Sequence, residues 1–135
     1  MTRRWIGGLA LVGLLVAGPA FADRPTTYYT TQTKSATSTS AQTDATLWTP
    51  ASGKAFVLQG CFVAAETPVR VEFEVSDVDV IPPFVMDSYG TALIGGGENP
   101  IYTSAVNAVL TYTTVISGLS ATYPNTSVMC WGFEL

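Results

Sequence analysis

The sequence predicts an all-β protein whose main part is a single antiparallel β-sandwich. Short runs in which apolar and polar residues alternate are separated by turn residues such as Pro and Gly. No apolar stripe with the period of a helix persists for three turns. Roughly seven or eight short strands at this spacing are typical of a sandwich. We therefore expect one sandwich domain over residues 47–135, preceded by two segments of a different kind.

The first 22 residues have the three parts of a secretory signal peptide. Arg3 and Arg4 form a basic region, residues 5–17 an apolar region, and Ala20–Ala22 a small-residue cleavage site. The apolar run is too short to span a bilayer as a helix. These features predict secretion, to the extracellular space or to the cell surface.

Cleavage after residue 22 would leave 113 residues with ten acidic and four basic side chains, a formal charge of −6. Such a chain lacks the basic surface that nucleic acid requires, and it has no attraction for anionic lipid. The sequence also has no histidine, the commonest general base and metal ligand. The composition therefore predicts a protein that is not an enzyme, needs no cofactor, and does not insert into a membrane once the signal is removed.

Residues 23–46 are predicted to form an extended arm rich in Thr and Ser. Twelve of the 21 residues from Thr26 to Thr46 are Ser or Thr, and Tyr28 and Tyr29 are the only large apolar residues. This segment alone cannot bury enough surface to fold. It can be a flexible or O-glycosylated stalk, an edge strand of its own domain, or a strand given to a neighbouring subunit. In the last case Tyr28 and Tyr29 would contact the neighbouring copy.

The most apolar strand is predicted over Lys54–Ala64. Phe56, Leu58 and Phe62 fall on one side of an extended chain, and Cys61 falls on the other. A strand that is apolar on both sides belongs in the middle of a sheet. We therefore expect this strand to lie at the centre of the domain.

Three further strands are predicted after it. Val69–Val75 alternates cleanly, with apolar residues inward and charged residues outward. The alternation changes phase after Val75, which a bulge or bend at Ser76 explains, and Ile81–Pro83 is expected to end the run. Ser104–Ile116 and Thr126–Glu134 are again strand-like.

Acidic residues near the Val69–Val75 strand raise the question of a calcium site. These residues are Glu72, Glu74, Asp77 and Asp79, with Asp87 and Glu98 elsewhere. Their oxygens suit calcium, with Asp77 and Asp79 as its candidate ligands, and paired carboxylates can also form a glycosidase site. The spacing of an EF-hand is absent, however, and no carboxylate pair stands out. Alternating acidic residues are usual on the solvated face of a strand, so no metal site is predicted.

Asn125 begins the tripeptide Asn-Thr-Ser, which satisfies the sequence requirement for N-glycosylation. A match of three residues is common by chance. Asn125 is therefore a glycosylation candidate only in a host that uses this modification.

The only two cysteines, Cys61 and Cys130, are predicted to form a disulfide. Secretion would place both in an oxidising compartment, where two cysteines of a small domain usually pair. Met129, Trp131 and Phe133 form the bulky row of the last strand, and Cys130 points the other way, as Cys61 does in its own strand. If both bulky rows face one core, the cysteines share the opposite face of one sheet and neighbouring strands bring them together. Two separate buried thiols, or bridges between subunits, are the alternatives.

The run WTPASGKAFVL from Trp48 to Leu58 resembles the opening of small jelly-roll β-sandwich proteins encoded by phages and their bacterial hosts. Asn99–Tyr102, Ala108–Thr111 and the closing CWGFE from Cys130 to Glu134 are similar to their final strands. The resemblance covers residues 45–135. It implies a jelly-roll fold, a structural role in an assembly of many subunits, and no catalytic residues. It also agrees with the disulfide, because the first long strand and the last are often neighbours in jelly rolls.

A signal peptide is not what a virion component needs, so the sequence favours an exported protein. We expect a structural subunit of a cell-surface or extracellular fibre that assembles with copies of itself through strand edges or the N-terminal arm. The alternatives are a small secreted carbohydrate-binding or adhesion module with surface glycans as partners, and a phage-derived virion protein.

Overall fold

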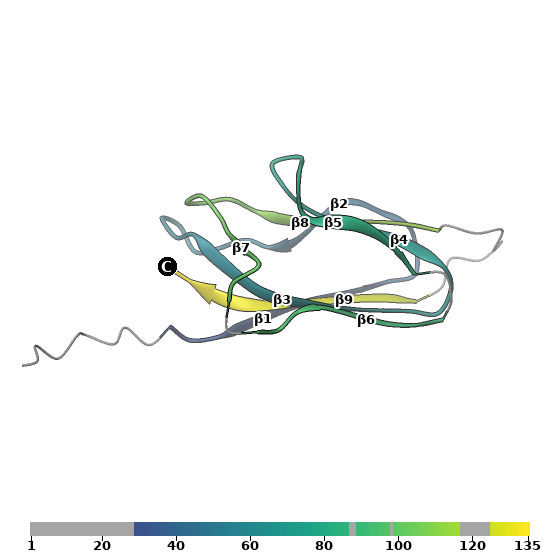
Figure 1. The fold of residues 1–135 in the computed structure, drawn as a ribbon. Coiled ribbons are helices and arrows are strands. Elements are labelled where there is room, and N and C mark those ends of the chain that lie inside the picture. The colour runs from purple at the N-terminus through teal and green to yellow at the C-terminus, as the bar shows by residue number, and fades with distance from the viewer. Residues whose placement is uncertain (1–28, 87–88, 98, 117–124) are drawn as a thin grey trace, which may run out of the picture.

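A computed structural model describes residues 29–86, 89–97, 99–116 and 125–135. In these ranges the chain forms nine strands and no helix (Figure 1). The strands are β1 (Gln32–Ser38), β2 (Gln42–Trp48), β3 (Phe56–Ala65), β4 (Val69–Val75), β5 (Val78–Met86), β6 (Gly90–Gly95), β7 (Tyr102–Thr103), β8 (Leu110–Ile116) and β9 (Thr126–Glu134). The predicted signal peptide, over residues 1–22, lies outside the described ranges. None of the described residues lies in a helix with the length and apolarity of a membrane span.

The strands form two antiparallel sheets packed face to face (Figure 1). Sheet A has the order β1-β9-β3-β6, and the short β7 also pairs with β3. Sheet B has the order β2-β8-β4-β5. The prediction of an all-β sandwich is therefore confirmed.

The Thr- and Ser-rich segment contributes the first edge strand of each sheet. β1 pairs with β9 in unbroken register, and β2 pairs with β8. Thr33, Ser35 and Thr37 are exposed on one side of β1, whereas Lys34 and Ala36 are half-buried on the other. Residues 32–46 therefore belong to the sandwich and do not form a separate arm. Of the alternatives for this segment, the structure agrees with an edge strand of its own domain. An edge strand needs few apolar residues, because its outer side faces water.

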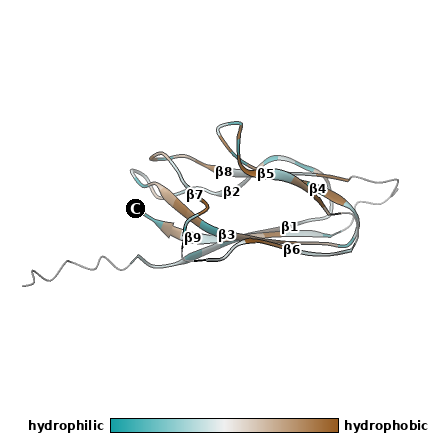
Figure 2. Ribbon diagram, in the orientation of Figure 1, coloured by the Kyte–Doolittle hydropathy of each residue, from teal (hydrophilic) through white to brown (hydrophobic). Residues whose placement is uncertain are grey.

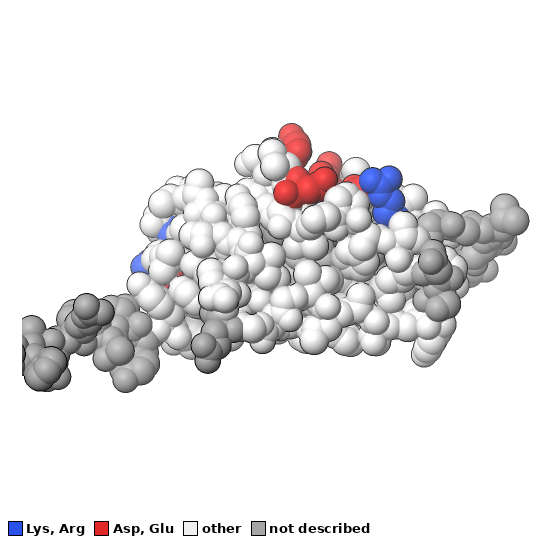
Figure 3. Space-filling model, viewed as in Figure 1, with Lys and Arg blue, Asp and Glu red and all other residues white. Residues whose placement is uncertain are grey.

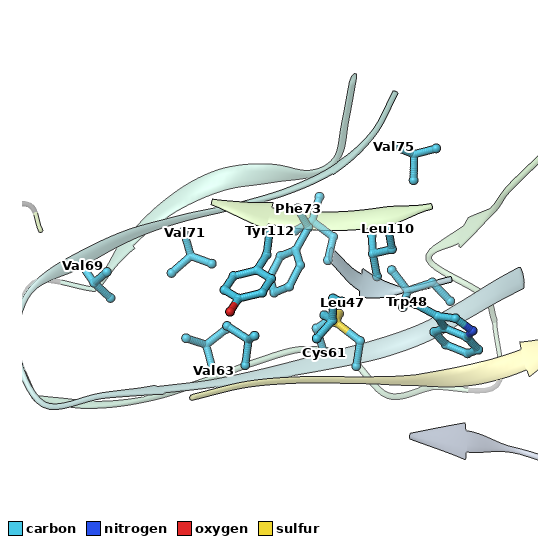
Figure 4. Packing of buried hydrophobic residues seen from close by; sticks show 14 of the residues in the cluster. Leu47, Trp48, Cys61, Val63, Val69, Val71, Phe73, Val75, Leu110 and Tyr112 are labelled. Atoms are coloured by element: carbon cyan, nitrogen blue, oxygen red, sulfur yellow. A yellow bond between two sulfur atoms is a disulfide. The ribbon is translucent and has the colours of Figure 1, made fainter. Parts of the chain in front are cut away.

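The hydrophobic core lies between the two sheets. The inward residues of β4 alternate as predicted from Val69 to Val75, and each is at most 6% exposed. Trp48 is fully buried and stacks on Phe56, with 5.4 Å between ring centroids. Figure 4 shows Phe73 of sheet B projecting toward sheet A, the sheet that carries Cys61. The hydropathy colours of Figure 2 mark β3 and β4 as major apolar contributors.

A bulge in β3 reverses which of its residues face the core. Leu58 pairs with Gly132 and Gly60 pairs with Trp131, so Gln59 is an extra residue in β3. Before the bulge Phe56 and Leu58 are buried, and after it Cys61, Val63 and Ala65 are buried. Phe62, which the sequence pattern placed in the same row as Phe56 and Leu58, therefore lies on the outer face of sheet A.

Two other predicted strand boundaries are corrected. Ser76 and Asp77 have φ values of 52° and 61° and form a hairpin turn between β4 and β5, not a bulge within one strand. β5 then continues through Pro82 and Pro83, because an edge strand tolerates residues without an N–H.

The strand predicted over Ser104–Ile116 begins later than expected. Asn107 has a φ of 60° and lies in a turn, so β8 starts at Leu110. β9 has the bounds that the sequence predicted, Thr126–Glu134.

Candidate functional site

The disulfide between Cys61 and Cys130 joins the two central strands of sheet A. The residues are directly paired across β3 and β9, with 4.0 Å between their Cα atoms, so the predicted pairing is confirmed. The predicted orientation of the two side chains was wrong. The sequence pattern placed both cysteines on the face of the sheet opposite the core, whereas both are fully buried on the core side. The bulge at Gln59 turns Cys61 inward, and the bulky residues of β9 face outward. No free cysteine occurs among the described residues.

The outer face of sheet A has an unusual composition, and we call it the neutral face. It consists of Thr33, Ser35 and Thr37 of β1; Ser127, Met129, Trp131 and Phe133 of β9; Gly60, Phe62 and Ala64 of β3; and Thr91, Leu93 and Gly95 of β6. None of these residues is charged. The strand alternation alone creates this face, because the charged residues of β1 and β9 fall on the inner side.

Apolar side chains form a continuous band across the neutral face. Phe62 is paired with Leu93 on one side and with Met129 on the other, and these partners are 67% and 36% exposed. The indole of Trp131 lies over Gly60, where a Cβ atom would overlap it. The band thus presents large apolar groups to solvent in the middle of a sheet.

Tyr29 extends this band at its N-terminal end. Its ring stacks on Phe133 of the same chain, with 4.8 Å between centroids and an interplanar angle of 12°, and it remains 46% exposed. The sequence suggested Tyr28 and Tyr29 as contacts to another copy. The structure gives Tyr29 an intramolecular partner, and Tyr28 lies outside the described residues.

The outer face of sheet B has the opposite character, and we call it the acidic face. It carries Glu72 and Glu74 of β4, Asp79 of β5 and Asp44 of β2, together with Arg70 of β4, which forms an ion pair with Glu72. Burial raises the pKa of Glu74, and the hydrogen bond and negative charge of Asp44 raise it further, with smaller contributions from Asp79 and Glu72. Figure 3 shows acidic atoms gathered over the layer of sheet B with a basic group beside them, while most of the layer of sheet A is white in this view.

The calcium candidates do not converge on a binding site among the described residues. Asp77 lies in the hairpin turn, and Asp79 is paired with Glu74 across β4 and β5. The described ranges contain no group of three His, Cys, Asp or Glu side chains placed to hold a metal ion. Asp87 and Glu98 lie outside those ranges.

A shallow hollow of about 210 Å³ lies at one end of the neutral face. It is lined by Ala64, Ala65, Glu66, Tyr89, Gly90, Thr91, Asn125 and Ser127. Asn125, the glycosylation candidate, is exposed, and its Nδ2 donates to Oε2 of Glu66 at 3.1 Å. The ring of Tyr89 is 76% exposed. The hollow therefore combines an aromatic ring with a carboxylate, an amide and two hydroxyls.

A second polar arrangement, which the sequence did not predict, closes the opposite end of the sandwich. The Glu134 carboxylate accepts hydrogen bonds from Nε1 of Trp48 at 3.1 Å and from the Ala51 backbone N–H at 3.2 Å. The Trp48 hydrogen bond lowers the pKa of Glu134, against the effect of burial. Lys34 lies over the Trp48 ring, 5.7 Å from its centroid. These contacts satisfy the indole N–H and hold the edge strand β1 to the core.

Neither protein-family models nor curated protein sequences give a match to this chain.

Proposed function

We propose that the protein is a structural subunit that associates with copies of itself through sheet A, as part of a secreted cell-surface or extracellular fibre. The observation that carries this proposal is the contrast between the neutral face and the acidic face. Two copies that meet through their acidic faces repel each other. Contact through the neutral face removes apolar groups from water and leaves no buried charge.

The disulfide supports the extracellular part of the proposal. Disulfides persist in oxidising compartments and are rare where thiols are kept reduced. In a small domain a covalent link between central strands also compensates for a limited core. A fibre subunit outside the cell benefits from both properties.

We propose further that the sandwich is a jelly roll, related to the phage and bacterial proteins that the sequence resembles. The strand orders support this, because four nested antiparallel pairs, β1 with β9, β2 with β8, β3 with β6 and β4 with β5, are divided between two packed sheets. A long hairpin rolled up on itself has this arrangement. Jelly rolls build viral capsids and lectins, so the fold suits a structural subunit or a virion protein, but function depends on the site.

The self-association can be tested on the chain from residue 23 to residue 135. We expect sedimentation velocity to show a mass that rises with concentration, and negative-stain micrographs to show ordered assemblies. Met129→Lys places a charge in the apolar band and should weaken association by about tenfold or more. Val115→Lys is the matched control, since Val115 is 49% exposed on the acidic face. A chain that stays monomeric, or two variants with equal effects, would overturn the proposal.

A second candidate function, glycan binding, is favoured by the hollow. Exposed aromatic rings pack against the C–H faces of sugars, and a few converging polar groups fix the orientation of a ligand. Tyr89 supplies the ring, and Glu66 and Asn125 supply the carboxylate and the amide. Binding of the monomer to a glycan array, lost in Tyr89→Ala, would support this function. Equal signals from both proteins would exclude the hollow as the site.

A further inference from the structure

Among the described residues the sandwich has four long edge strands, β1 and β6 in sheet A and β2 and β5 in sheet B, and the two-residue β7 lies on the same side of β3 as β6. An edge strand presents unpaired N–H and C=O groups, to which a strand of another molecule can add. Proteins usually protect such edges with charges, prolines or bulges. The four edges of this protein differ sharply in these protections.

Three of the edges are protected. β1 carries Lys34 near its middle, and the side chain points to the inner side of the sheet toward Trp48. β2 has two register shifts, and its Asp44 has a φ of 49°. β5 contains Pro82 and Pro83 and also has register shifts relative to β4. Each of these features interrupts or discourages pairing with a further strand.

Between Gly90 and Ile94 the edge of β6 has none of these protections, and only its last residue, Gly95, has a positive φ, of 74°. Its sequence, GTALIG, contains no charged residue and no proline, and it pairs with β3 without a register shift from Gly90 to Gly95. Outside this ladder, the described residues make no backbone hydrogen bond to Thr91–Ile94. Leu93, on the outer side of the strand, is 67% exposed.

We infer that β6 is the edge through which two copies pair, forming an antiparallel β6–β6 contact that joins two A sheets into one. This inference rests on the proposed self-association and identifies β6 as the surface of the first contact between two copies. A two-fold axis near the middle of β6 brings Leu93 of each copy close to its counterpart, so the same short apolar strand serves both sides. Contacts of this two-fold kind are the commonest in homo-oligomers.

The contact closes after two copies, because each chain has one β6. It also joins the two neutral faces into one larger surface, since β6 lies at the edge of that face. The dimer is then the unit that assembles further.

Single cysteine variants test the pairing, because the described part of the chain has no free thiol and the sequence has only two cysteines. Leu93→Cys should form a covalent dimer with oxidised glutathione at concentrations where the wild type associates. Val85→Cys is the control, since Val85 lies on the protected edge β5 and is 50% exposed. It should remain monomeric under the same conditions.

Amide hydrogen exchange provides the second measurement, on the wild-type chain. Pairing should slow exchange in residues 91–94 at high concentration relative to low concentration, whereas contact through the neutral face alone leaves these edge amides unchanged. Because Leu93 also belongs to the neutral face, cross-linking alone does not separate the two contacts. Association without slowed exchange in residues 91–94 would therefore overturn the β6 inference and leave the proposed function standing. A chain that is monomeric throughout would overturn both.

Discussion

The two sheets share one core but present opposite outer faces. Inside, both follow the same rule, with buried residues such as Val63 in sheet A and Val71 in sheet B. Outside, sheet B carries Glu72, Glu74 and Asp79, whereas the neutral face of sheet A carries no charge. The inner residues are fixed by the need to bury apolar surface, and the outer residues are free of that need. A difference between the sheets in what they bind would therefore be found in the residues of their outer faces.

The two sheets also differ in what holds their strands together. Sheet A has the disulfide between its central strands, and Trp131 covers β3 from outside. Sheet B is held by its hydrogen-bonded ladders and by apolar packing against sheet A. This difference predicts which perturbations act on which sheet.

Reduction of the disulfide should have the largest effect. The bridge spans 69 positions of the chain, and closing a loop of that size contributes about 4 kcal/mol through the entropy of the unfolded state. Urea unfolding with and without a reductant should show this loss, and the double variant Cys61→Ala/Cys130→Ala should unfold at least as easily as the reduced protein. An unchanged midpoint would mean that sheet A does not depend on its covalent link.

Filling the space under Trp131 should have the next largest effect. A Cβ on Gly60 overlaps the indole, so Gly60→Ala must displace the ring or the strand and should cost about 1–3 kcal/mol. Gly97→Ala is the matched control, because its Cβ would meet no atom within 4 Å. Thermal unfolding and tryptophan fluorescence measure both variants. Equal melting temperatures would show that the cover over sheet A adjusts freely.

Two buried threonines, one in each sheet, allow the same replacement of a hydroxyl by a methyl group to be compared. Thr126 of β9 is 2% exposed and its hydroxyl has no hydrogen-bond partner among the described residues, so Thr126→Val should stabilise the fold by about 1 kcal/mol. Thr114 of β8 is fully buried and accepts a hydrogen bond from the Gln42 N–H at 3.2 Å. Thr114→Val should therefore destabilise by a similar amount. Denaturation midpoints that move in the same direction would contradict this contrast.

The smallest effect concerns pH. The raised pKa of Glu74 means a penalty on the folded state at neutral pH, which disappears as the pH falls through that pKa. The lowered pKa of Glu134 means a stabilisation present above its unfolded pKa and lost as the pH falls through the folded value. Glu74→Gln should thus raise the melting temperature at pH 7 and Glu134→Gln should lower it. Both differences should shrink in acid, and a difference that grows below pH 4 would contradict the assignment.

The sequence was most informative where one strand face is fully buried. The alternation of Val69–Val75 and the bounds of Thr126–Glu134 were predicted correctly, because apolar burial leaves a clear period of two in such strands. The disulfide pairing was also predicted, since two cysteines on apolar strands have few other partners.

The sequence was least informative at edges and irregular positions. β1 lacks large apolar residues, because Ala36 and the stem of Lys34 suffice on its inner side. The bulge at Gln59 leaves no compositional signal, yet it decides that Cys61 faces inward and Phe62 outward. The neutral face was missed for the same reason, since its bulky residues were assigned to the core.

The bond between Cys61 and Cys130 also determines how a subunit responds to tension. A chain drawn out from both ends gains about 3.4 Å per residue, so the 69 positions from Cys61 to Cys130 would contribute about 230 Å of extension. The disulfide prevents this extension, because force passes directly from one sulfur to the other and not through the loop between them. Only the strands and loops before Cys61, namely β1, β2 and the first half of β3, and the residues beyond Cys130 can be pulled straight. In a fibre, such a subunit resists lengthening even after its outer strands have been stripped from the sheets.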